Sequence, residues 1–192
     1  MLSGNRFGEA GSTVVIEEFM EGEEASLLAF VDGKTVVPMI ASQDHKRIFD
    51  GDKGPNTGGM GTYAPAPVLT DALRDEAMKT ILEPMVAAMA KEGMPYVGCL
   101  YAGLMITNEG PKVVEFNARF GDPETQVVLP LLEGDLGQIM MACATGTLQS
   151  DMVKWKDSSA ACVILASKGY PETSSKGDVI LGELVQYDTS II

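Results

Sequence analysis

Cysteine, histidine and tryptophan are scarce in this sequence, and their scarcity narrows the classes of protein to which it can belong. The 192 residues contain three cysteines, one histidine and one tryptophan. Cys99, Cys143 and Cys162 are widely separated in apolar stretches, which fits neither the spacing of zinc ligands nor a disulfide framework. We therefore expect buried thiols in a reducing compartment, and so a cytoplasmic protein. No apolar run reaches the length of a membrane span, so we expect no membrane partner.

Basic residues are also few, with 14 Lys and Arg against 27 Asp and Glu and a net charge of −13. A chain this acidic is poorly suited to bind nucleic acids or anionic membrane surfaces. A nucleotide is not excluded, because a local cluster of metal and basic groups can hold phosphates on an acidic protein. Hydrophobic residues make up 45% of the chain and can fill a core, and the length suits one domain or one domain with part of another.

Hairpin signals that alternate with helix signals indicate an α+β fold with a mostly antiparallel sheet. Two hairpins are expected, one joining residues 25–31 to 34–41 through Asp32-Gly33 and one joining 96–107 to 112–118. Further strands are expected at 13–19, 159–167 and 179–185, with a glycine-rich loop at 48–62. The expected helices run from the N-cap Thr70 to Gly93 with an interruption at Pro84, within 125–132, and from the N-cap Asp135 to about Thr145.

A strand followed by a sharp corner is the strongest sign of a site. Side chains alternate along a strand, so Glu115, Asn117 and Arg119 share one face. The other face carries Val114, Phe116 and Ala118, which we expect to pack on the core. Carboxylate and amide oxygens suit Mg²⁺, and a neighbouring arginine suits a phosphate or carboxylate group. The same pattern also fits the solvated face of an edge strand, but the polar corner that follows at 121–123 favours a site.

Three other segments are candidates, each with a plainer alternative. Residues 13–24 form a hydrophobic run ending in glutamates, which fits a nucleotide seat or a solvated strand end. Residues 43–47 contain the one histidine beside Lys46 and Arg47, which fits a site or an exposed hairpin end. The loop at 52–61 can wrap an anion or act as a lid, or it is an ordinary connection without the Walker A pattern. No serine or cysteine lies in a nucleophile motif, which argues against a catalytic triad.

Six segments, taken in order along the chain, resemble the phosphoribosylamine–glycine ligase family, also called glycinamide ribonucleotide synthetases. They are residues 15–19, 22–24, 43–47, 54–61, 101–105 and 115–124. The run Arg119-Phe120-Gly121-Asp122-Pro123-Glu124 is the most specific of them. The resemblance extends over about residues 5–185 and implies the C-terminal portion of an ATP-grasp fold, in which ATP lies between two α+β subdomains.

The resemblance also implies roles for particular residues. The ATP-binding set would be Glu17, Glu18, Phe19, Met20, Glu24 and Asn56, with the strand backbone meeting adenine and Glu24 binding the ribose. Glu115 and Asn117 would hold Mg²⁺ or Mn²⁺ on the ATP phosphates, and Arg119 would act at the acyl-phosphate centre. Lys46, Arg47 and Asp122 would border the substrate and phosphate region. Many ATP-grasp enzymes have a second acidic metal ligand on the preceding strand, and that position would fall near Gly103.

The implied reaction joins glycine to 5-phosphoribosylamine through glycyl phosphate, giving glycinamide ribonucleotide, ADP and phosphate in purine biosynthesis. The partners would be ATP, glycine and 5-phosphoribosylamine, together with other domains of a larger purine-synthesis enzyme. Such chemistry depends on positioning and charge stabilisation, and it needs no side-chain nucleophile.

Family members carry an N-terminal domain and a first ATP-grasp subdomain before the position of Thr13, so the resemblance implies a fragment. We expect residues 1–12 to be a linker or remnant of a preceding subdomain, 13–157 a partial ATP-grasp domain and 158–192 the truncated start of a C-terminal domain. Such a chain should bind ATP weakly and turn over poorly. The alternative is a non-catalytic ATP-binding or interaction module derived from an ATP-grasp enzyme.

Overall fold

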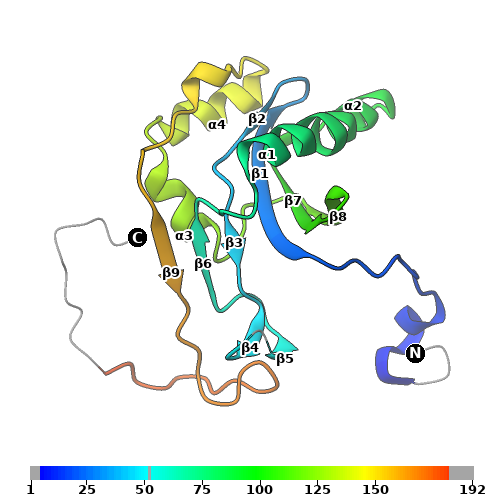
Figure 1. Cartoon of the computed structure of the whole chain (residues 1–192), viewed down its shortest axis with the longest axis vertical. Coiled ribbons are helices and arrows are strands. Elements are labelled where there is room, and N and C mark those ends of the chain that lie inside the picture. The colour runs from blue at the N-terminus through cyan, green and yellow to red at the C-terminus, as the bar shows by residue number, and fades with distance from the viewer. Residues whose placement is uncertain (1–4, 52, 182–192) are drawn as a thin grey trace.

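The centre of the molecule is a four-stranded antiparallel sheet with strand order β2-β1-β7-β8 (Figure 1). The computed structural model describes residues 5–51 and 53–181. β1 (Glu23–Asp32) pairs along its whole length with β7 (Val97–Thr107), while β2 (Val36–Pro38) and β8 (Gly110–Asn117) flank this pair. Both hairpins expected from the sequence are therefore confirmed, and they lie side by side in one sheet.

A helical rod covers one face of this sheet. It consists of α1 (Asp71–Ala77), the π-helical turn η2 (Met78–Leu82) and α2 (Glu83–Lys91). The hydroxyl oxygen of Thr70 accepts from the backbone N–H of Leu73 at 3.4 Å, which confirms the expected N-cap. The interruption expected at Pro84 is the π-helical turn just before it, and Gly93 follows the rod with φ of 77°.

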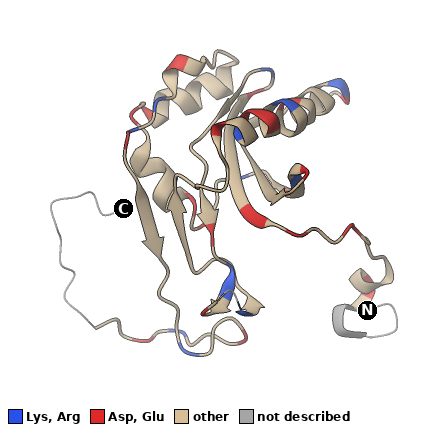
Figure 2. Ribbon diagram, in the orientation of Figure 1, with Lys and Arg blue, Asp and Glu red and all other residues tan. Residues whose placement is uncertain are grey.

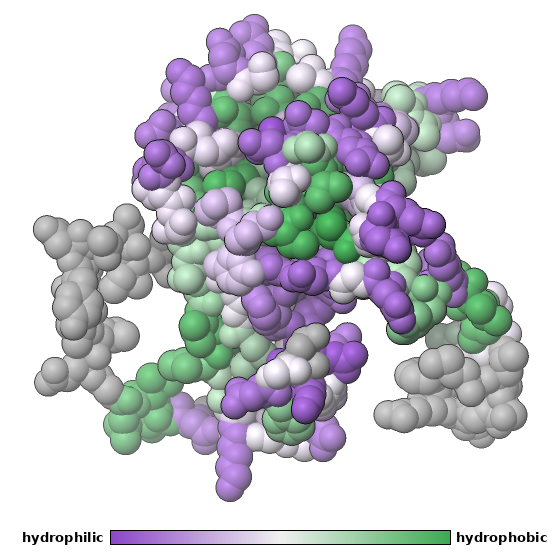
Figure 3. Space-filling view, in the orientation of Figure 1, coloured by the Kyte–Doolittle hydropathy of each residue, from purple (hydrophilic) through white to green (hydrophobic). Residues whose placement is uncertain are grey.

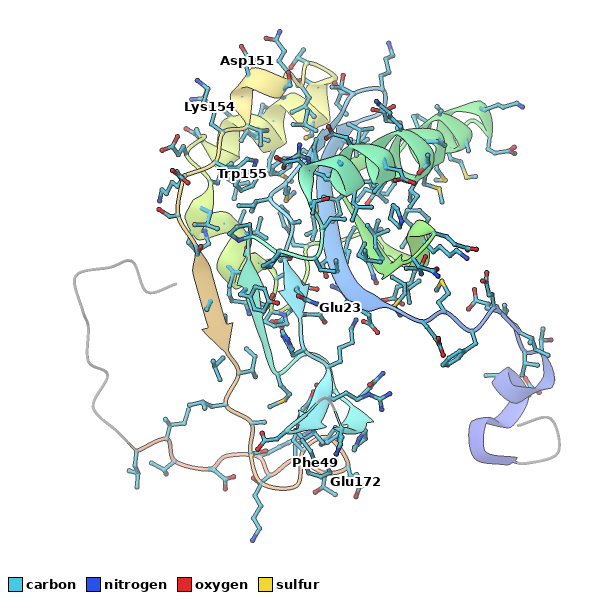
Figure 4. The ribbon with its side chains drawn as sticks, viewed as in Figure 1. Glu23, Phe49, Asp151, Lys154, Trp155 and Glu172 are labelled. Atoms are coloured by element: carbon cyan, nitrogen blue, oxygen red, sulfur yellow. The ribbon has the colours of Figure 1, made fainter. Side chains whose placement is uncertain are left out.

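Shorter helices cover the opposite face. They are α3 (Thr125–Val128), η3 (Leu129–Leu131), α4 (Leu136–Thr145) and η4 (Ser150–Met152). Asp135 caps α4 by accepting from the N–H of Gln138 at 3.0 Å, and the left-handed Gly146 ends it at φ of 70°, as the sequence predicts. Trp155 packs on this side of the sheet, in the chain that follows η4 (Figure 4).

The core has two halves because β1 is buried on both of its faces. Leu28 and Phe30 pack with Val127 on the α3–α4 side, whereas Leu27 packs with Leu82 on the α1–α2 side. A strand covered on both faces reads as a nearly continuous apolar run, which explains the composition of residues 27–31. Among the described helices, none has the length and apolar character of a membrane span.

Asp32 connects the first hairpin to the segment that follows α4. One of its carboxylate oxygens accepts from the N–H groups of Lys34 and Thr35 at 3.0 and 2.7 Å, beside Gly33 with φ of 96°. The other accepts from the N–H of Leu148 at 3.1 Å. Burial alone would raise the pKa of Asp32, but these hydrogen bonds outweigh it and lower the pKa below its ordinary value of 3.8.

The expected strand at 13–19 is wrong. Residues 13–22 are extended and lead away from the body of the molecule, towards the 3₁₀ helix η1 (Asn5–Ser12), and β1 begins only at Glu23 (Figure 1). A strand needs a neighbour for its backbone hydrogen bonds, and no described strand pairs with this segment. Its apolar side chains Val15, Ile16 and Phe19 are 82–89% exposed.

The loop expected at 48–62 also contains more regular structure than predicted. β4 (Arg47–Phe49) and β5 (Lys53–Asn56) form a small hairpin, and β6 (Gly61–Ala64) lies between β3 (Gln43–Asp44) and β9 (Ala160–Val163) in a separate sheet. Gly51 and Gly54, with φ of 72° and 86°, take the left-handed backbone positions of the β4–β5 hairpin. Of the glycines that suggested a loop, Gly51 thus lies in a turn, Gly54 within β5 and Gly61 at the start of β6.

β9 is shorter and less buried than the strand expected at 159–167. It pairs only with β6 among the described strands, so alternate residues face outward. Val163 is 76% exposed and Leu165, just beyond the strand, is 94% exposed. Figure 3 shows apolar surface on the side of the molecule where the chain continues beyond β9. The described residues 179–181 form no strand, and the remainder of the strand expected at 179–185 lies outside the described residues.

Candidate functional site

The polar residues of the candidate site come together at one end of the central sheet. The antiparallel register places Ser26 of β1 opposite Gly103 of β7, and Gly103 opposite Glu115 of β8. Residues paired directly across antiparallel strands point to the same face, so these three positions form a row. Gly103 thus lies opposite Glu115, as expected, and a Cβ atom there would lie 3.4 Å from the Glu115 Cγ.

Glu115 and Asn117 lie next to each other on β8, as the alternation predicts. The Asn117 side-chain amide donates to the Glu115 carboxylate at 3.0 Å, and Glu115 lines a small cavity of about 10 Å³ together with Glu24, Asp44 and Lys46. Arg119 lies beyond the end of β8, exposed, and its guanidinium donates to the Phe120 carbonyl at 2.9 Å. The structure therefore joins Glu115 and Asn117, and it places Arg119 on the connection between β8 and the corner at 121–123.

The apolar face of β8 departs from simple alternation. Gly103 pairs with Glu115 whereas Leu104 pairs with Val113, so Val114 is an extra residue in a bulge. Val114 is 38% exposed and Ala118 is exposed, so the expectation that both face the core is wrong. The bulge turns Val114 out of the core, and the strand has already ended at Asn117.

Lys46 connects two strands at the rim of this cavity. Its ammonium group lies 2.6 Å from a carboxylate oxygen of Glu24 and 3.4 Å from one of Asp44, and Figure 2 shows the acidic start of β1 beside the basic β4 region. Burial alone would lower the pKa of Lys46, but the hydrogen bond to Glu24 and the negative charge of Asp44 outweigh it and raise the pKa. Lys46 therefore stays charged and fixes Glu24 at the cavity.

Arg47 and Asn56 belong to the β4–β5 hairpin. They are directly paired in the register, both are exposed, and the Arg47 guanidinium donates to the Gly54 carbonyl at 2.7 Å. Asp122 lies at the corner before α3, where its carboxylate accepts from the Gln126 side chain at 2.7 Å. Arg47 and Asn56 therefore share one hairpin, Asp122 lies on another segment, and none of the three lines the cavity.

The glycine loop does not offer its backbone as an anion cradle. The N–H of Thr57 donates to the Lys46 carbonyl and that of Met60 to the His45 carbonyl, both at 2.8 Å. The N–H of Gly58 donates to the Tyr170 hydroxyl at 2.8 Å, and that of Gly59 to the Thr57 hydroxyl at 3.1 Å. All four donors are therefore occupied within the chain, so the suggestion that this part of the loop wraps an anion is wrong.

Three of the residues predicted to bind the nucleotide line a second, open groove. Glu18, Phe19 and Met20 line an open groove of about 370 Å³ together with the β7–β8 turn, while Glu17 is exposed on the same extended segment. Lys112 closes one side of the groove through an ion pair with Glu18 at 3.0 Å. The structure therefore separates these residues from the cavity that Glu24 lines.

Sequence reasoning missed a buried polar network beneath the cavity. The Ser26 hydroxyl lies 2.8 Å from the Tyr101 hydroxyl, and it donates to the carboxylates of Glu124 at 3.1 Å and Asp44 at 3.4 Å. The Tyr101 hydroxyl also donates to the Glu124 carboxylate. Burial, followed by the charge of Glu124, raises the pKa of Tyr101, so its hydroxyl stays protonated and can donate. The available signal was Ser26 itself, a polar residue inside an apolar strand.

The donor set favours a metal shared with a ligand over an all-protein metal cage. Within the described ranges, no three or more His, Cys, Asp or Glu side chains are arranged to hold a metal ion. Glu115 and Asn117 provide one carboxylate and one amide, and Mg²⁺ commonly takes one or two carboxylates with its remaining ligands from phosphates and water. The arrangement therefore suits a cation that arrives with a phosphate.

Comparisons with known proteins identify the family and the fold of this chain. The family model described as phosphoribosylglycinamide synthetase, ATP-grasp (A) domain, matches residues 1–125. The phosphoribosylamine–glycine ligase of Caulobacter vibrioides is 55% identical over 192 residues, which cover 100% of this chain and 45% of that protein. The trifunctional purine biosynthetic protein adenosine-3 of Gallus gallus is 54% identical over 183 residues, which cover 95% of this chain and 18% of that protein.

A solved structure is similar as well. The crystal structure of phosphoribosylamine–glycine ligase from Thermotoga maritima matches with a TM-score of 0.74 and 34% sequence identity, over 83% of this chain and 40% of that one. The chain thus spans less than half the length of these relatives. The α+β ATP-grasp fold expected from the sequence is confirmed.

Proposed function

We propose a function on one premise: this chain belongs to the phosphoribosylglycinamide synthetase family, whose ATP-grasp domain its residues 1–125 match. The parent activity is ATP-dependent ligation of glycine to 5-phosphoribosylamine through glycyl phosphate, which gives glycinamide ribonucleotide, ADP and phosphate. This chain contributes the part of the site that holds the metal-bound end of ATP. We propose a cytoplasmic location for it, which its three free cysteines support.

The pairing of Glu115 with Asn117 at the open end of β8 is the observation on which this proposal rests. Among the described residues, no hydrogen bond engages the second Glu115 carboxylate oxygen or the Asn117 side-chain amide oxygen. Both are hard oxygen donors, so they fit Mg²⁺ or Mn²⁺. A divalent ion held there would neutralise charge on the ATP phosphates.

The other residues take roles around this pair. Glu24 accepts from ribose hydroxyls with the carboxylate oxygen that Lys46 leaves open, and the backbone of residues 17–20 meets the adenine. Arg119, whose guanidinium is exposed at the corner, stabilises charge near the acyl-phosphate centre. The substrates are bordered by Lys46, Arg47 and Asp122, and Asn56 lies beside ATP.

The chemistry of this proposal is an in-line phosphoryl transfer followed by an amide-forming displacement. The glycine carboxylate attacks the γ-phosphate of ATP to give glycyl phosphate and ADP, and the amine of 5-phosphoribosylamine then displaces phosphate. The protein supplies position and charge for both steps. No thiolate is needed, and burial raises the pKa of Cys99 to about 12, which keeps it a thiol.

The test compares Mg-ATP binding by the 192-residue chain and by Glu115→Ala, using isothermal titration calorimetry. Loss of a carboxylate ligand should weaken Mg-ATP binding by about 10- to 100-fold, the usual effect of disturbing a metal site. Glu92→Ala, which removes an exposed glutamate at the end of α2, is the matched control and should bind like the wild type. Equal affinity in the wild type and Glu115→Ala would refute the site.

A second measurement separates the ligase from the non-catalytic alternative. Phosphate release is measured with glycine, 5-phosphoribosylamine and Mg-ATP, and the isolated chain should show little turnover. The Caulobacter vibrioides ligase with the residue equivalent to Glu115 replaced should lose turnover to a similar extent as it loses Mg-ATP affinity. Turnover that survives this replacement would contradict the proposed role.

A further inference from the structure

Glu124 is the least exposed acidic residue of the part of the chain that the structure describes, at 2% exposure. It stands between the corner at 121–123 and helix α3, and its carbonyl accepts from the N–H groups of Val127 and Val128 at 3.1 and 2.9 Å. Its carboxylate points into the sheet and accepts from Tyr101 and, at 3.1 Å, from Ser26. Burying a carboxylate is unfavourable unless hydrogen bonds compensate, so the arrangement calls for an explanation.

These contacts connect the corner to the two central strands. Tyr101 belongs to β7 and Ser26 to β1, and both hydroxyls donate to the same oxygen of the Glu124 carboxylate. The other oxygen lies against Gly121, where an added Cβ atom would overlap it. The carboxylate therefore fixes both ends of the four-residue turn from Gly121 to Glu124.

Strand β7, which carries Tyr101, also pairs with β8, the strand that carries the proposed metal ligands Glu115 and Asn117. Tyr101 lies directly opposite Asn117, and Gly103, two residues further along, lies opposite Glu115. A displacement of the corner relative to β7 would therefore change its position relative to Glu115 and Asn117 as well. Arg119 lies on the connection between β8 and this corner.

We propose that Glu124 is a positioning residue, which holds the corner that contains Asp122 and directly follows Arg119 in register with Glu115 and Asn117 through its bonds to Tyr101 and Ser26. The inference rests on the proposed function, since it assigns Glu124 to the same Mg-ATP site. Glu124 itself does not touch the reacting groups. Its contribution is to the angle and distance at which Arg119 meets the phosphates.

The first test is a double-mutant cycle on Mg-ATP affinity in the 192-residue chain. Glu124→Ala and Tyr101→Phe should each weaken binding by about 5- to 10-fold, the factor expected for one net hydrogen bond. Glu124→Gln keeps an acceptor oxygen for the hydroxyls and should recover most of the affinity. Tyr96→Phe, which removes the hydroxyl that donates to the Cys99 carbonyl at 2.6 Å, is the matched control and should bind like the wild type.

The cycle distinguishes positioning from a general loss of structure. In an Arg119→Ala background, Glu124→Ala should have no further effect on Mg-ATP affinity, because the group that it positions is gone. Additive losses, or an unchanged affinity in Glu124→Ala alone, would overturn the proposal.

Hydrogen exchange supplies a readout that does not depend on nucleotide binding. The N–H groups of Thr125 and Gln126 donate to carbonyls of the corner, and that of Val127 donates to the Glu124 carbonyl next to it, so their exchange reports on its opening. Glu124→Ala and Tyr101→Phe should speed their exchange by about tenfold or more and leave the N–H groups of α2 within about twofold. If Glu115→Ala binds Mg-ATP like the wild type, the proposed function fails. Hydrogen exchange then remains as the test of whether Glu124 holds the corner. Unchanged exchange at the corner, or equal opening of α2, would overturn the role of Glu124.

Discussion

Asp32 offers a quantitative test of how the hairpin and the helices are joined. It accepts three backbone N–H bonds, from Lys34, Thr35 and Leu148. Replacing it with alanine leaves all three donors unpaired. The two turn donors can reach water, at about 1 kcal/mol each, while the bond to Leu148 is buried and its loss costs about 1–3 kcal/mol. The sum is about 3–5 kcal/mol, a large part of the roughly 5–15 kcal/mol that stabilises a typical domain.

The asparagine variant separates these contributions. Asp32→Asn keeps one oxygen for the turn and presents an NH₂ group to Leu148, so it should lose only the buried bond, about 1–3 kcal/mol. Urea unfolding followed by circular dichroism and by Trp155 fluorescence measures both variants. Asp151→Asn replaces an exposed aspartate and serves as the matched control, with an expected change below about 0.5 kcal/mol.

The effect should also depend on pH. Because the folded-state pKa of Asp32 lies below its ordinary value of 3.8, its stabilising contribution is fully present above that value. The contribution is lost as the pH falls from 3.8 through the folded-state pKa, since the carboxylate becomes protonated. The difference in unfolding free energy between wild type and Asp32→Asn should therefore shrink over that interval. Equal costs for the asparagine and alanine variants, or a difference that does not change with pH, would refute this reasoning.

Three further predictions concern the site. Gly59→Ala should destabilise the chain by about 1–3 kcal/mol in urea unfolding, because φ is 119° and the added Cβ atom would overlap Pro123; Gly93→Ala, with φ of 77° and open space around it, should cost less. Gly103→Asp adds a carboxylate opposite Glu115 and should tighten Mn²⁺ binding by about tenfold in electron paramagnetic resonance titrations, and weaker binding would contradict the shared face. Removing the metal with EDTA should weaken ATP binding by about tenfold or more in calorimetry, and undiminished binding would exclude a metal-bridged site.

The features that the sequence predicts correctly are those encoded by neighbouring residues. Asp32-Gly33 specifies its hairpin, and Thr70 and Asp135 cap their helices, because each acts on backbone groups within three residues of itself. The alternation along β8 places Glu115 and Asn117 side by side for the same reason.

The features that could not be predicted depend on partners far along the chain. The apolar run at 13–19 has strand composition, yet no described strand pairs with it, and composition cannot supply a neighbour. The bulge at Val114 depends on the register with β7. The bond between Ser26 and Glu124 spans 98 residues, and only the paired sheet shows that it exists.

If the cavity binds ATP as proposed, its charges favour the metal complex over the free nucleotide. Glu24, Asp44 and Glu115 line the cavity, Glu124 lies beneath it, and Lys46 is already paired with two of these carboxylates. A phosphate oxygen brought to about 4 Å from one carboxylate would be repelled by about 4 kcal/mol at an effective dielectric constant of about 20. A divalent cation between them turns both contacts into attractions. Under the proposed function, the acidity of the cavity therefore favours a triphosphate that carries its own cation.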